Sequence, residues 1–181
     1  EKMVAAEDLL SFLKHHVRED LKYHHEFRIS LAECPNACSQ PQIKDIGIIA
    51  ALVPGLTDEA CSGCKACVEA CPDNCIHLEV TTEKPEIDLE RCMSCGKCIQ
   101  VCPTRTIQEQ KRGFRVQLGG KLGRHPRLAM ELPGVYTERN VLEIVRYCIT
   151  FYKRNSRRGK RFAEIFKKSD VDALLETLRH D

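Results

Sequence analysis

Two copies of one cysteine pattern constrain this chain more than any other feature of its sequence. Each copy has the spacing Cys-x2-Cys-x2-Cys-x3-Cys-Pro, and the copies begin at Cys61 and at Cys92. Three cysteines so close together place three thiolates on one face of a loop, and the amide N–H groups between them can point at inorganic sulfide. The proline after the fourth cysteine keeps the chain from closing back onto its own loop. The doubled pattern therefore predicts two cubane 4Fe-4S clusters.

The fourth cysteine of each copy is expected to serve the other cluster, as it does in chains that carry two such runs. One predicted ligand set is Cys61, Cys64, Cys67 and Cys102. The other is Cys92, Cys95, Cys98 and Cys71. Zinc knuckles and disulfides also use paired cysteines, but neither requires the third cysteine, the fourth after three residues and the proline in both copies.

Composition sets the frame around these motifs. The chain has 181 residues, about one domain with room for a small addition, and 43% of them are hydrophobic. Twelve cysteines without a secretory leader predict free thiols in a reducing compartment, and we expect the cytoplasm. The longest apolar stretch, residues 46–56, contains Gly47, Pro54 and Gly55 and is too short for a membrane span.

The small net charge of +2 conceals two segments of opposite sign. Residues 111–168 hold 16 Lys and Arg against 4 Glu, a balance of +12, whereas residues 54–110 hold 5 basic against 10 acidic residues, a balance of −5. A basic face indicates an anionic partner, such as a nucleic acid, a lipid surface, a carboxylate-rich cofactor or an anionic substrate. Charge alone does not choose among them.

Apolar periodicity predicts helices over residues 4–21 and 141–152, and a last helix capped by Ser169. Alternating or β-branched runs predict strands at residues 27–31, 43–53, 76–80, 84–88 and 114–118. The two short middle strands resemble those that link the halves of a ferredoxin. Because strands bracket the cysteine segment on both sides, we expect residues 54–108 to be an insertion in a host domain formed by residues 1–53 plus 109–181.

A second cysteine motif lies in the host domain. The run Glu33-Cys34-Pro35-Asn36-Ala37-Cys38, followed by Asp45-Ile46-Gly47-Ile48, resembles the second cysteine pair of sirohaem-containing sulfite and nitrite reductases. In that family four cysteines hold a cubane, and the last of them also bridges to the sirohaem iron. The resemblance implies that Cys34 is a ligand of this third cluster and that Cys38 is the catalytic, bridging thiolate.

The resemblance extends over nearly the whole chain. Residues 113–124 resemble the glycine-rich strand and turn of the family, Gly159-x-x-Phe162 resembles its C-terminal end, and an inserted ferredoxin is similar to that of dissimilatory and anaerobic sulfite reductases. The implied fold is α+β, a partial sirohaem-reductase domain interrupted by a dicluster insertion. Since sirohaem carries eight carboxylates, Lys121, Arg124 and Arg127 are candidate cofactor contacts. The alternative for these three is a solvated basic turn.

Other residues carry weaker signals. The basic run 153–161 is interpreted as a solvated loop, and no motif favours nucleic-acid binding. Cys148 lies on an apolar helical stripe and is expected in the core, and Cys75 is expected to pack near a cluster rather than ligate it. The histidine pairs at positions 15, 16, 24 and 25 do not share one helical face, so we expect ordinary surface or core histidines.

The sequence also departs from the family pattern. No cysteine precedes Cys34, the upstream basic residues that grip sulfite are missing, and the chain begins at Glu1. We therefore expect a C-terminal piece of a longer reductase, with two self-contained cubanes, no firmly held sirohaem and no catalysis of its own.

The resemblance implies a route for electrons. A low-potential donor would feed the two cubanes, which would pass electrons to the Cys38-bridged centre for the reduction of sulfite, or of nitrite, in six single-electron steps; the ferredoxin insertion favours sulfite. Two other functions stay open. One is a stand-alone ferredoxin-like electron carrier, and the other is a docking subunit without sirohaem.

Overall fold

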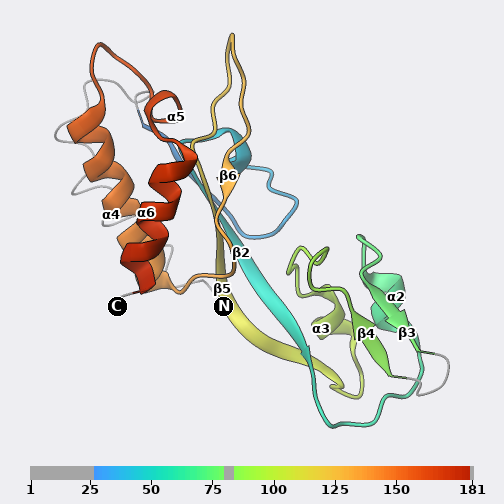
Figure 1. The fold of residues 1–181 in the computed structure, drawn as a ribbon. Coiled ribbons are helices and arrows are strands. Elements are labelled where there is room, and N and C mark those ends of the chain that lie inside the picture. The colour runs from blue at the N-terminus through green and yellow to red at the C-terminus, as the bar shows by residue number, and fades with distance from the viewer. Residues whose placement is uncertain (1–26, 80–83, 180–181) are drawn as a thin grey trace. The chain divides into compact units, whose positions relative to one another are not determined.

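The computed structural model describes residues 27–79 and 84–179 (Figure 1). They form two compact units. Unit 1 comprises residues up to 32, 37–49 and those from 114 onward, and unit 2 comprises residues 33–36 and 50–113. The helix expected over residues 4–21, with its flanking histidines, lies outside the described residues.

A four-stranded sheet has the order β1-β2-β5-β6. Strand β1 (Ile29–Ala32) runs parallel to β2 (Ile46–Leu56), and β6 (Met130–Glu131) runs antiparallel to the end of β5 (Ile107–Leu118). Both long strands extend beyond the expected ends: β2 does not close at Pro54-Gly55 but reaches Leu56, and β5 begins at Ile107 rather than at Phe114. The reason is strand pairing, since β2 and β5 are hydrogen-bonded neighbours and continue past the local breakers.

A short 3-10 turn, η1 (Pro41–Ile43), leads into β2 where the sequence indicated the start of a strand. Two glycines allow this turn to lie close to the sheet. A Cβ atom on Gly47 would be 2.5 Å from the carbonyl oxygen of Pro41, and one on Gly120 would be 2.6 Å from that of Gln42. Glycine is therefore required at both positions by close approach of the backbone.

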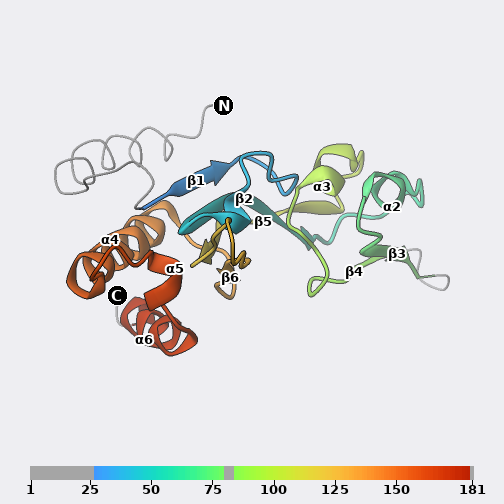
Figure 2. The ribbon, with the colours of Figure 1, turned by 90° about the horizontal axis from the view of Figure 1, so that it is seen from above.

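The described residues of unit 1 also form three helices, α4 (Glu138–Asn155), α5 (Phe162–Ile165) and α6 (Lys168–Arg179). Figure 2 shows them on one side of the sheet. Phe162 and Phe166 stack with ring centroids 4.6 Å apart, and Phe27 and Phe151 pack edge-on against them. The prediction that Ser169 caps the last helix is wrong, because Ser169 lies inside the first turn of α6. Instead, the Lys167 amide N–H donates to Asp170 Oδ2 over 2.7 Å.

Unit 2 is built from two similar halves. Helix α2 (Ala66–Ala70) lies within the first cysteine run and strand β3 (Ile76–Leu78) follows it, while β4 (Pro85–Ile87) precedes the second run and α3 (Lys97–Val101) lies within it. β3 and β4 pair antiparallel, with His77 opposite Glu86. The small core consists of Cys67, Ile76, Cys98 and Ile107, in which each residue of the first half matches one 31 positions later. No helix within the described residues is long and apolar enough to cross a membrane.

Candidate functional site

One cavity in unit 2 gathers cysteines from both copies of the motif. Its lining includes Cys61, Cys64, Cys67 and Cys102, the set that the sequence predicts for one cubane. Cys102 arrives from the end of α3, and the other three come from the loop and first turn of α2. Thr104, Thr106 and Ile107 complete the wall on the side of Cys102. The structure therefore brings together the four thiols of this predicted set.

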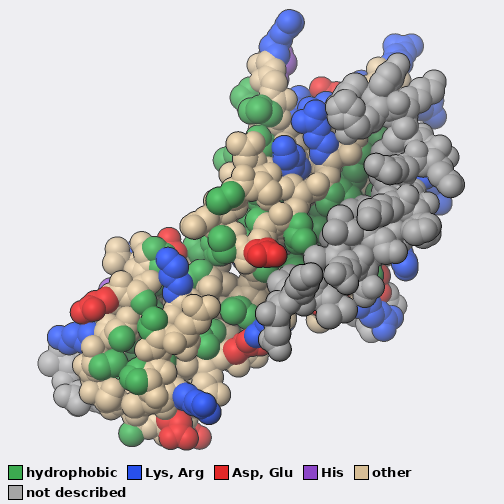
Figure 3. All heavy atoms as spheres, turned by 180° about the vertical axis from the view of Figure 1, so that it is seen from behind, with side chains coloured by type: hydrophobic (Ala, Val, Ile, Leu, Met, Phe, Trp, Pro, Cys, Tyr) green, Lys and Arg blue, Asp and Glu red, His purple; other side chains and the backbone are tan. Residues whose placement is uncertain are grey.

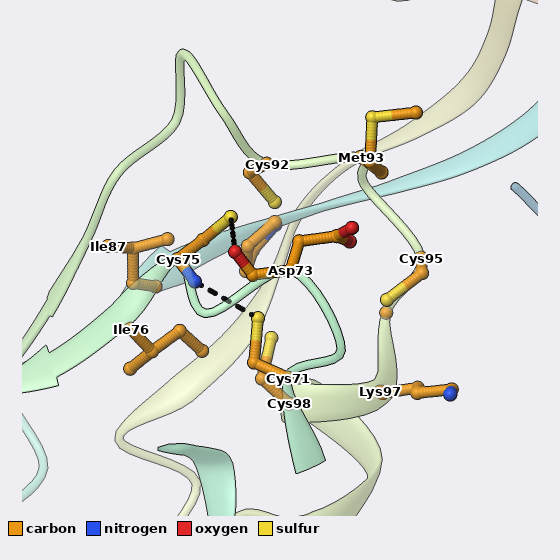
Figure 4. Close-up of a pocket in the computed structure, with 12 residues that line it drawn as sticks. Cys71, Asp73, Cys75, Ile76, Ile87, Cys92, Met93, Cys95, Lys97 and Cys98 are labelled. Carbon is orange, nitrogen blue, oxygen red and sulfur yellow. Dashed lines mark hydrogen bonds between the residues drawn. The ribbon is translucent and has the colours of Figure 1, made fainter. Parts of the chain in front are cut away.

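The second cavity has the complementary composition. Its lining includes Cys71, Cys92, Cys95 and Cys98, together with Asp73 and Cys75 (Figure 4). Among the described residues, no three His, Cys, Asp or Glu side chains lie close enough to hold a single metal ion. A cubane attaches each cysteine to a different iron atom, so its four thiols surround a larger volume than the ligands of one ion.

Packing of the two short helices explains the exchange of the fourth cysteine. Helices α2 and α3 contact each other directly, so Cys71 at the end of α2 lies at the cavity of the second run and Cys102 at the end of α3 lies at the cavity of the first. Val68, Ile87 and Ile99 pack against the core between the helices. The apolar contact surface thus positions both terminal cysteines.

Backbone amides point at the cysteine sulfurs in both cavities. Gly63 N–H donates to Cys61 Sγ over 3.5 Å and Ser94 N–H to Cys92 Sγ over 3.4 Å, at equivalent positions of the two runs. Left-handed residues produce these tight loops, in the pairs Gly63 and Ser94, Lys65 and Gly96, and Asn74 and Arg105, each 31 positions apart. Amide donors of this kind stabilise the negative charge of a bound cluster.

The thiols differ in how well the protein stabilises their ionised form. Burial raises the pKa of Cys67 and Cys92, and it raises the pKa of Cys98 to about 11. At Cys102 burial acts in the same direction, but hydrogen bonds from the Ile107 amide and the Thr104 hydroxyl outweigh it and lower the pKa. Because iron binds the thiolate, cluster assembly must release these protons. Four thiols around each cavity, with amide donors between them, fit a 4Fe-4S cluster.

Two further cysteines are buried thiols outside the predicted sets. Cys75 is 1% exposed, and its thiol donates to the Asp73 carbonyl oxygen, with Sγ and oxygen 3.5 Å apart. Burial raises the pKa of Cys75 to about 11. Cys148 is fully buried in α4, and burial raises the pKa of its thiol more than that of Cys75. Both remain protonated at neutral pH, as expected of cysteines in packed positions.

Cys34 and Cys38 lie on the loop between β1 and η1, and both are exposed. Two serines anchor the part of this loop after Cys38. Ser30 Oγ donates to the Ser39 carbonyl over 2.9 Å, and Ser39 Oγ donates to the Leu31 carbonyl over 2.8 Å. Cys38 therefore stands beside the end of β1 with its thiol accessible.

Two of the three basic residues proposed as cofactor contacts already have protein partners. Lys121 Nζ lies 3.3 Å from Glu164 Oε1, and Arg127 donates from Nε and Nη2 to the Gly119 carbonyl over 3.1 and 2.9 Å. Lys121 and Arg127 face each other in a hairpin, and Arg124 is exposed near its tip. Figure 3 shows basic side chains at the tip of this hairpin above hydrophobic ones. Leu122 and Leu128 are more than half exposed, at 61% and 68%.

Asp45 is a buried acid that supports this part of unit 1. Its side chain is 0% exposed; Oδ2 accepts the Arg28 amide over 2.9 Å and lies 3.6 Å from Arg161 Nη2. Burial raises the pKa of Asp45, although the Arg28 amide and Arg161 work against this. Its carbonyl accepts the Gly119 amide at the start of the hairpin, over 2.8 Å. Asp45 thus connects the entry to β2 with the end of β5.

The residues that line the cavities and were not singled out from the sequence include Asp73, Thr104 and Thr106. Asp73 and Thr104 occupy equivalent positions, as do Cys75 and Thr106. Alignment of the chain with itself at the 31-residue offset would have identified them. They are the positions where the two copies carry different polar groups.

Comparisons with known proteins agree with these observations. The family of the nitrite and sulphite reductase 4Fe-4S domain matches residues 3–181. The coenzyme F420-dependent sulfite reductase of Methanocaldococcus jannaschii is 36% identical over 157 residues, which cover 86% of this chain and 25% of that protein.

The fold is also similar to that in the crystal structure of dissimilatory sulfite reductase I. The TM-score is 0.54 at 18% identity, and the match covers 83% of this chain and 41% of the other. This similarity confirms the α+β fold. The family match and the identity to the curated relative confirm the resemblance inferred from the cysteine motifs. The chain spans a quarter of the length of its curated relative. It belongs to the nitrite and sulphite reductase 4Fe-4S domain family, an oxidoreductase family in which iron–sulfur groups transfer electrons.

Proposed function

We propose that this chain passes electrons through two 4Fe-4S clusters to a sirohaem-linked 4Fe-4S centre, within a longer reductase that converts sulfite to sulfide. The observation that carries the proposal is the composition of the two cavities in unit 2. Each is lined by three cysteines of one motif copy and the fourth of the other. Such sets, with amide N–H groups directed at sulfur, are suited to holding cubanes.

The residues of unit 2 would tune the clusters rather than react themselves. When bound, each cubane accepts and releases one electron at a time. The amides of Gly63, Ser94, Cys75 and Ile107 donate to cysteine sulfurs and would stabilise the charge that reduction adds. Ile76, Ile87 and Ile107 limit access of water beside the thiols. A low-potential electron donor would be the partner of this unit.

The accessible Cys38 thiolate would bridge the third cluster to sirohaem, and Cys34 would be a second ligand of that cluster. The remaining two ligands would come from a part of the reductase outside this sequence. Arg124, exposed on the hairpin, is the best placed of the three basic candidates to contact a carboxylate, because Lys121 and Arg127 would first have to leave their present partners. The name of the relative supports sulfite over nitrite, and twelve thiols support a reducing, cytoplasmic setting.

Paired cysteine substitutions test the exchanged ligand sets. Cys61→Ala with Cys102→Ala removes two predicted ligands of the same cluster, so about four iron atoms of the expected eight should remain in the reconstituted protein. The matched pair Cys61→Ala with Cys71→Ala removes one ligand from each cluster and should damage both. Iron and sulfide analysis measures the difference. Loss of only one cluster in the second pair and damage to both in the first would refute the exchanged sets.

The role of Cys38 requires the intact reductase. Cys38→Ser should abolish sulfite reduction and alter the sirohaem absorption band while the two clusters of unit 2 stay assembled, as judged by iron content and electron paramagnetic resonance (EPR) after dithionite reduction. Cys148→Ser is the control for a thiol away from the proposed centre. Sulfite turnover retained in the Cys38 variant would contradict the bridging role.

One observation favours electron carriage without sirohaem as a second candidate. All residues that line the two cavities belong to unit 2, so cluster binding there requires nothing from unit 1. The absorption spectrum of the intact protein distinguishes the two functions. A sirohaem band with iron beyond eight atoms supports the reductase, and a cubane spectrum alone supports the carrier.

A further inference from the structure

The two cavities are copies of one design, so their differences can be compared position by position. The amide donors are similar: Gly63 and Ser94 serve the first cysteine of each run at equivalent positions, and the last cysteine of each run also accepts one amide, Cys71 from Cys75 over 3.3 Å and Cys102 from Ile107, one position further along its copy, over 3.4 Å. Each lining also includes one lysine, Lys65 or Lys97. The backbone donors and the lysines therefore do not account for a difference between the two cavities. The two cavities differ in their remaining side chains.

At the cavity of Cys102 two threonines form a chain of hydroxyl groups that ends at sulfur. Thr104 Oγ1 lies 2.8 Å from Thr106 Oγ1 and 3.8 Å from Cys102 Sγ. A cysteine bound to iron has no proton, so the Thr104 hydroxyl must donate to sulfur and its oxygen is left to accept from Thr106. Thr106 is 3% exposed, which shields the outer hydrogen bond from water. Every hydroxyl proton in the chain then points toward the cluster.

The equivalent positions in the other cavity carry opposite properties. Asp73 stands in place of Thr104, and a carboxylate at neutral pH donates no hydrogen bond and adds a negative charge. Cys75 stands in place of Thr106, and its thiol donates to the Asp73 carbonyl, not to a cluster ligand. Met93 replaces Ser62 in the lining. Figure 4 shows Asp73 and Cys75 among the cysteines of this cavity.

We propose that the Thr104–Thr106 hydroxyl chain gives the cluster of Cys61, Cys64, Cys67 and Cys102 the higher reduction potential, and that Asp73 lowers the potential of the cluster of Cys71, Cys92, Cys95 and Cys98. Reduction adds one negative charge to a cubane, which hydrogen-bond donors to its sulfurs stabilise and a nearby carboxylate opposes. The downhill direction for an electron is then from the second cluster to the first. This inference rests on the proposed binding of two cubanes.

A reductive titration of the reconstituted full chain, followed by EPR, tests the order of potentials. The wild type should show two one-electron steps. Thr104→Val keeps the shape of the side chain but removes its hydroxyl, so the reduction potential of the upper step should fall. We expect the ratio of the two reduction equilibrium constants to shrink about tenfold, which corresponds to about 59 mV for one electron. Thr104→Ser keeps the hydroxyl and should restore the wild-type separation.

Asp73→Asn provides an independent test from the other cavity. Its side chain is exposed, so solvent screens the charge and the lower step should rise by only about twofold to threefold in equilibrium constant. Glu86→Gln is the matched control, because Glu86 is an exposed acid of β4 that lines neither cavity. It should leave both steps unchanged.

The signs of the shifts decide the inference. Removing either the Thr104 hydroxyl or the Asp73 charge should narrow the separation between the two reduction potentials. A separation that widens or stays constant in Thr104→Val, or a wild type with one unresolved step, would overturn the assigned order. Iron analysis separates this failure from that of the proposed function. About eight iron atoms with the wrong shifts would refute only the order of potentials, whereas absence of two cubanes would refute their binding.

Discussion

At the scale of single residues, the Arg115–Glu131 pair ties β5 to β6. Arg115 donates from Nε and Nη2 to the two carboxylate oxygens over 2.6 and 2.8 Å, and Gln117 adds a third hydrogen bond. Burial opposes ionisation of Glu131, but these donors prevail and lower its pKa. A depressed pKa in the folded state contributes stability above the ordinary carboxylate pKa, which is lost as the pH falls through the folded value.

Glu131→Gln should therefore lower the free energy of unfolding at pH 7 by about 1 kcal/mol, since the pair is bidentate but partly exposed. The difference from the wild type should shrink as the pH falls below 4.5 and through the lowered pKa of Glu131 in the folded protein, where the wild-type carboxylate takes up a proton. Urea unfolding across a pH series measures this. Glu109→Gln, which breaks an exposed local pair with Arg112, should cost much less. An effect of Glu131→Gln that is independent of pH would contradict the assigned ion pair.

At the scale of elements, the N-terminus of α4 carries a capping box. The Asn140 amide donates to Thr137 Oγ1 over 3.3 Å, and the Thr137 amide donates to Asn140 Oδ1 over 3.4 Å. Thr137→Ala should destabilise unit 1 by about 1 kcal/mol in thermal or urea unfolding. Thr177→Ala is the control within a helix, because the Thr177 hydroxyl donates to the Ala173 and Leu174 carbonyls of its own helix, and this substitution should change the stability little. Equal effects of the two would argue against the cap.

The 3-10 turn that precedes β2 depends on its glycines. Gly47→Ala would place a methyl group against the Pro41 backbone, which cannot move aside as a flexible side chain could. We expect a loss of about 1 to 3 kcal/mol in the free energy of unfolding. Urea unfolding measures it, and an alanine variant as stable as the wild type would show that the turn can shift at little cost.

At the scale of the whole molecule, the two units differ in the interactions that stabilise each of them internally. Unit 1 has buried strands and an aromatic cluster, whereas unit 2 has a small core cluster of four residues, Cys67, Ile76, Cys98 and Ile107, two of which are predicted iron ligands. Binding of a metal group to a site that the unfolded chain lacks adds directly to folding stability. The integrity of unit 2 should therefore depend on its clusters.

Removal of iron with a chelator should increase amide hydrogen exchange over residues 61–107, while the amides of Ile46, Ile48, Val116 and α4 stay protected. Exchange measured by mass spectrometry on holo and apo protein tests this. Protection of residues 61–107 that persists without iron would show that the apolar core of unit 2 suffices.

Sequence patterns predicted the elements well and their ends less well. The offset of 31 residues predicted which cysteines the structure gathers around each cavity, because a local motif and its helix recur intact. Strands β2 and β5 exceed their expected ends because pairing overrides local breakers such as Pro54-Gly55. Ser169 was a reasonable cap by type, but the start of α6 depends on where the preceding chain turns at Phe166 and Lys167.

The sequence by itself determined the class of chemistry, iron–sulfur electron transfer, because the cysteine spacing and the Cys34–Cys38 motif are local patterns that a single sequence shows. It also identified the family, which the comparisons confirm. Only the tertiary structure decided what surrounds each thiol. The hydroxyl chain of Thr104 and Thr106, the placement of Asp73, and the partners that occupy Lys121 and Arg127 all depend on contacts between segments brought together by folding. The 31-residue offset shows which of these positions differ between the two copies, but it does not show which atoms each side chain contacts.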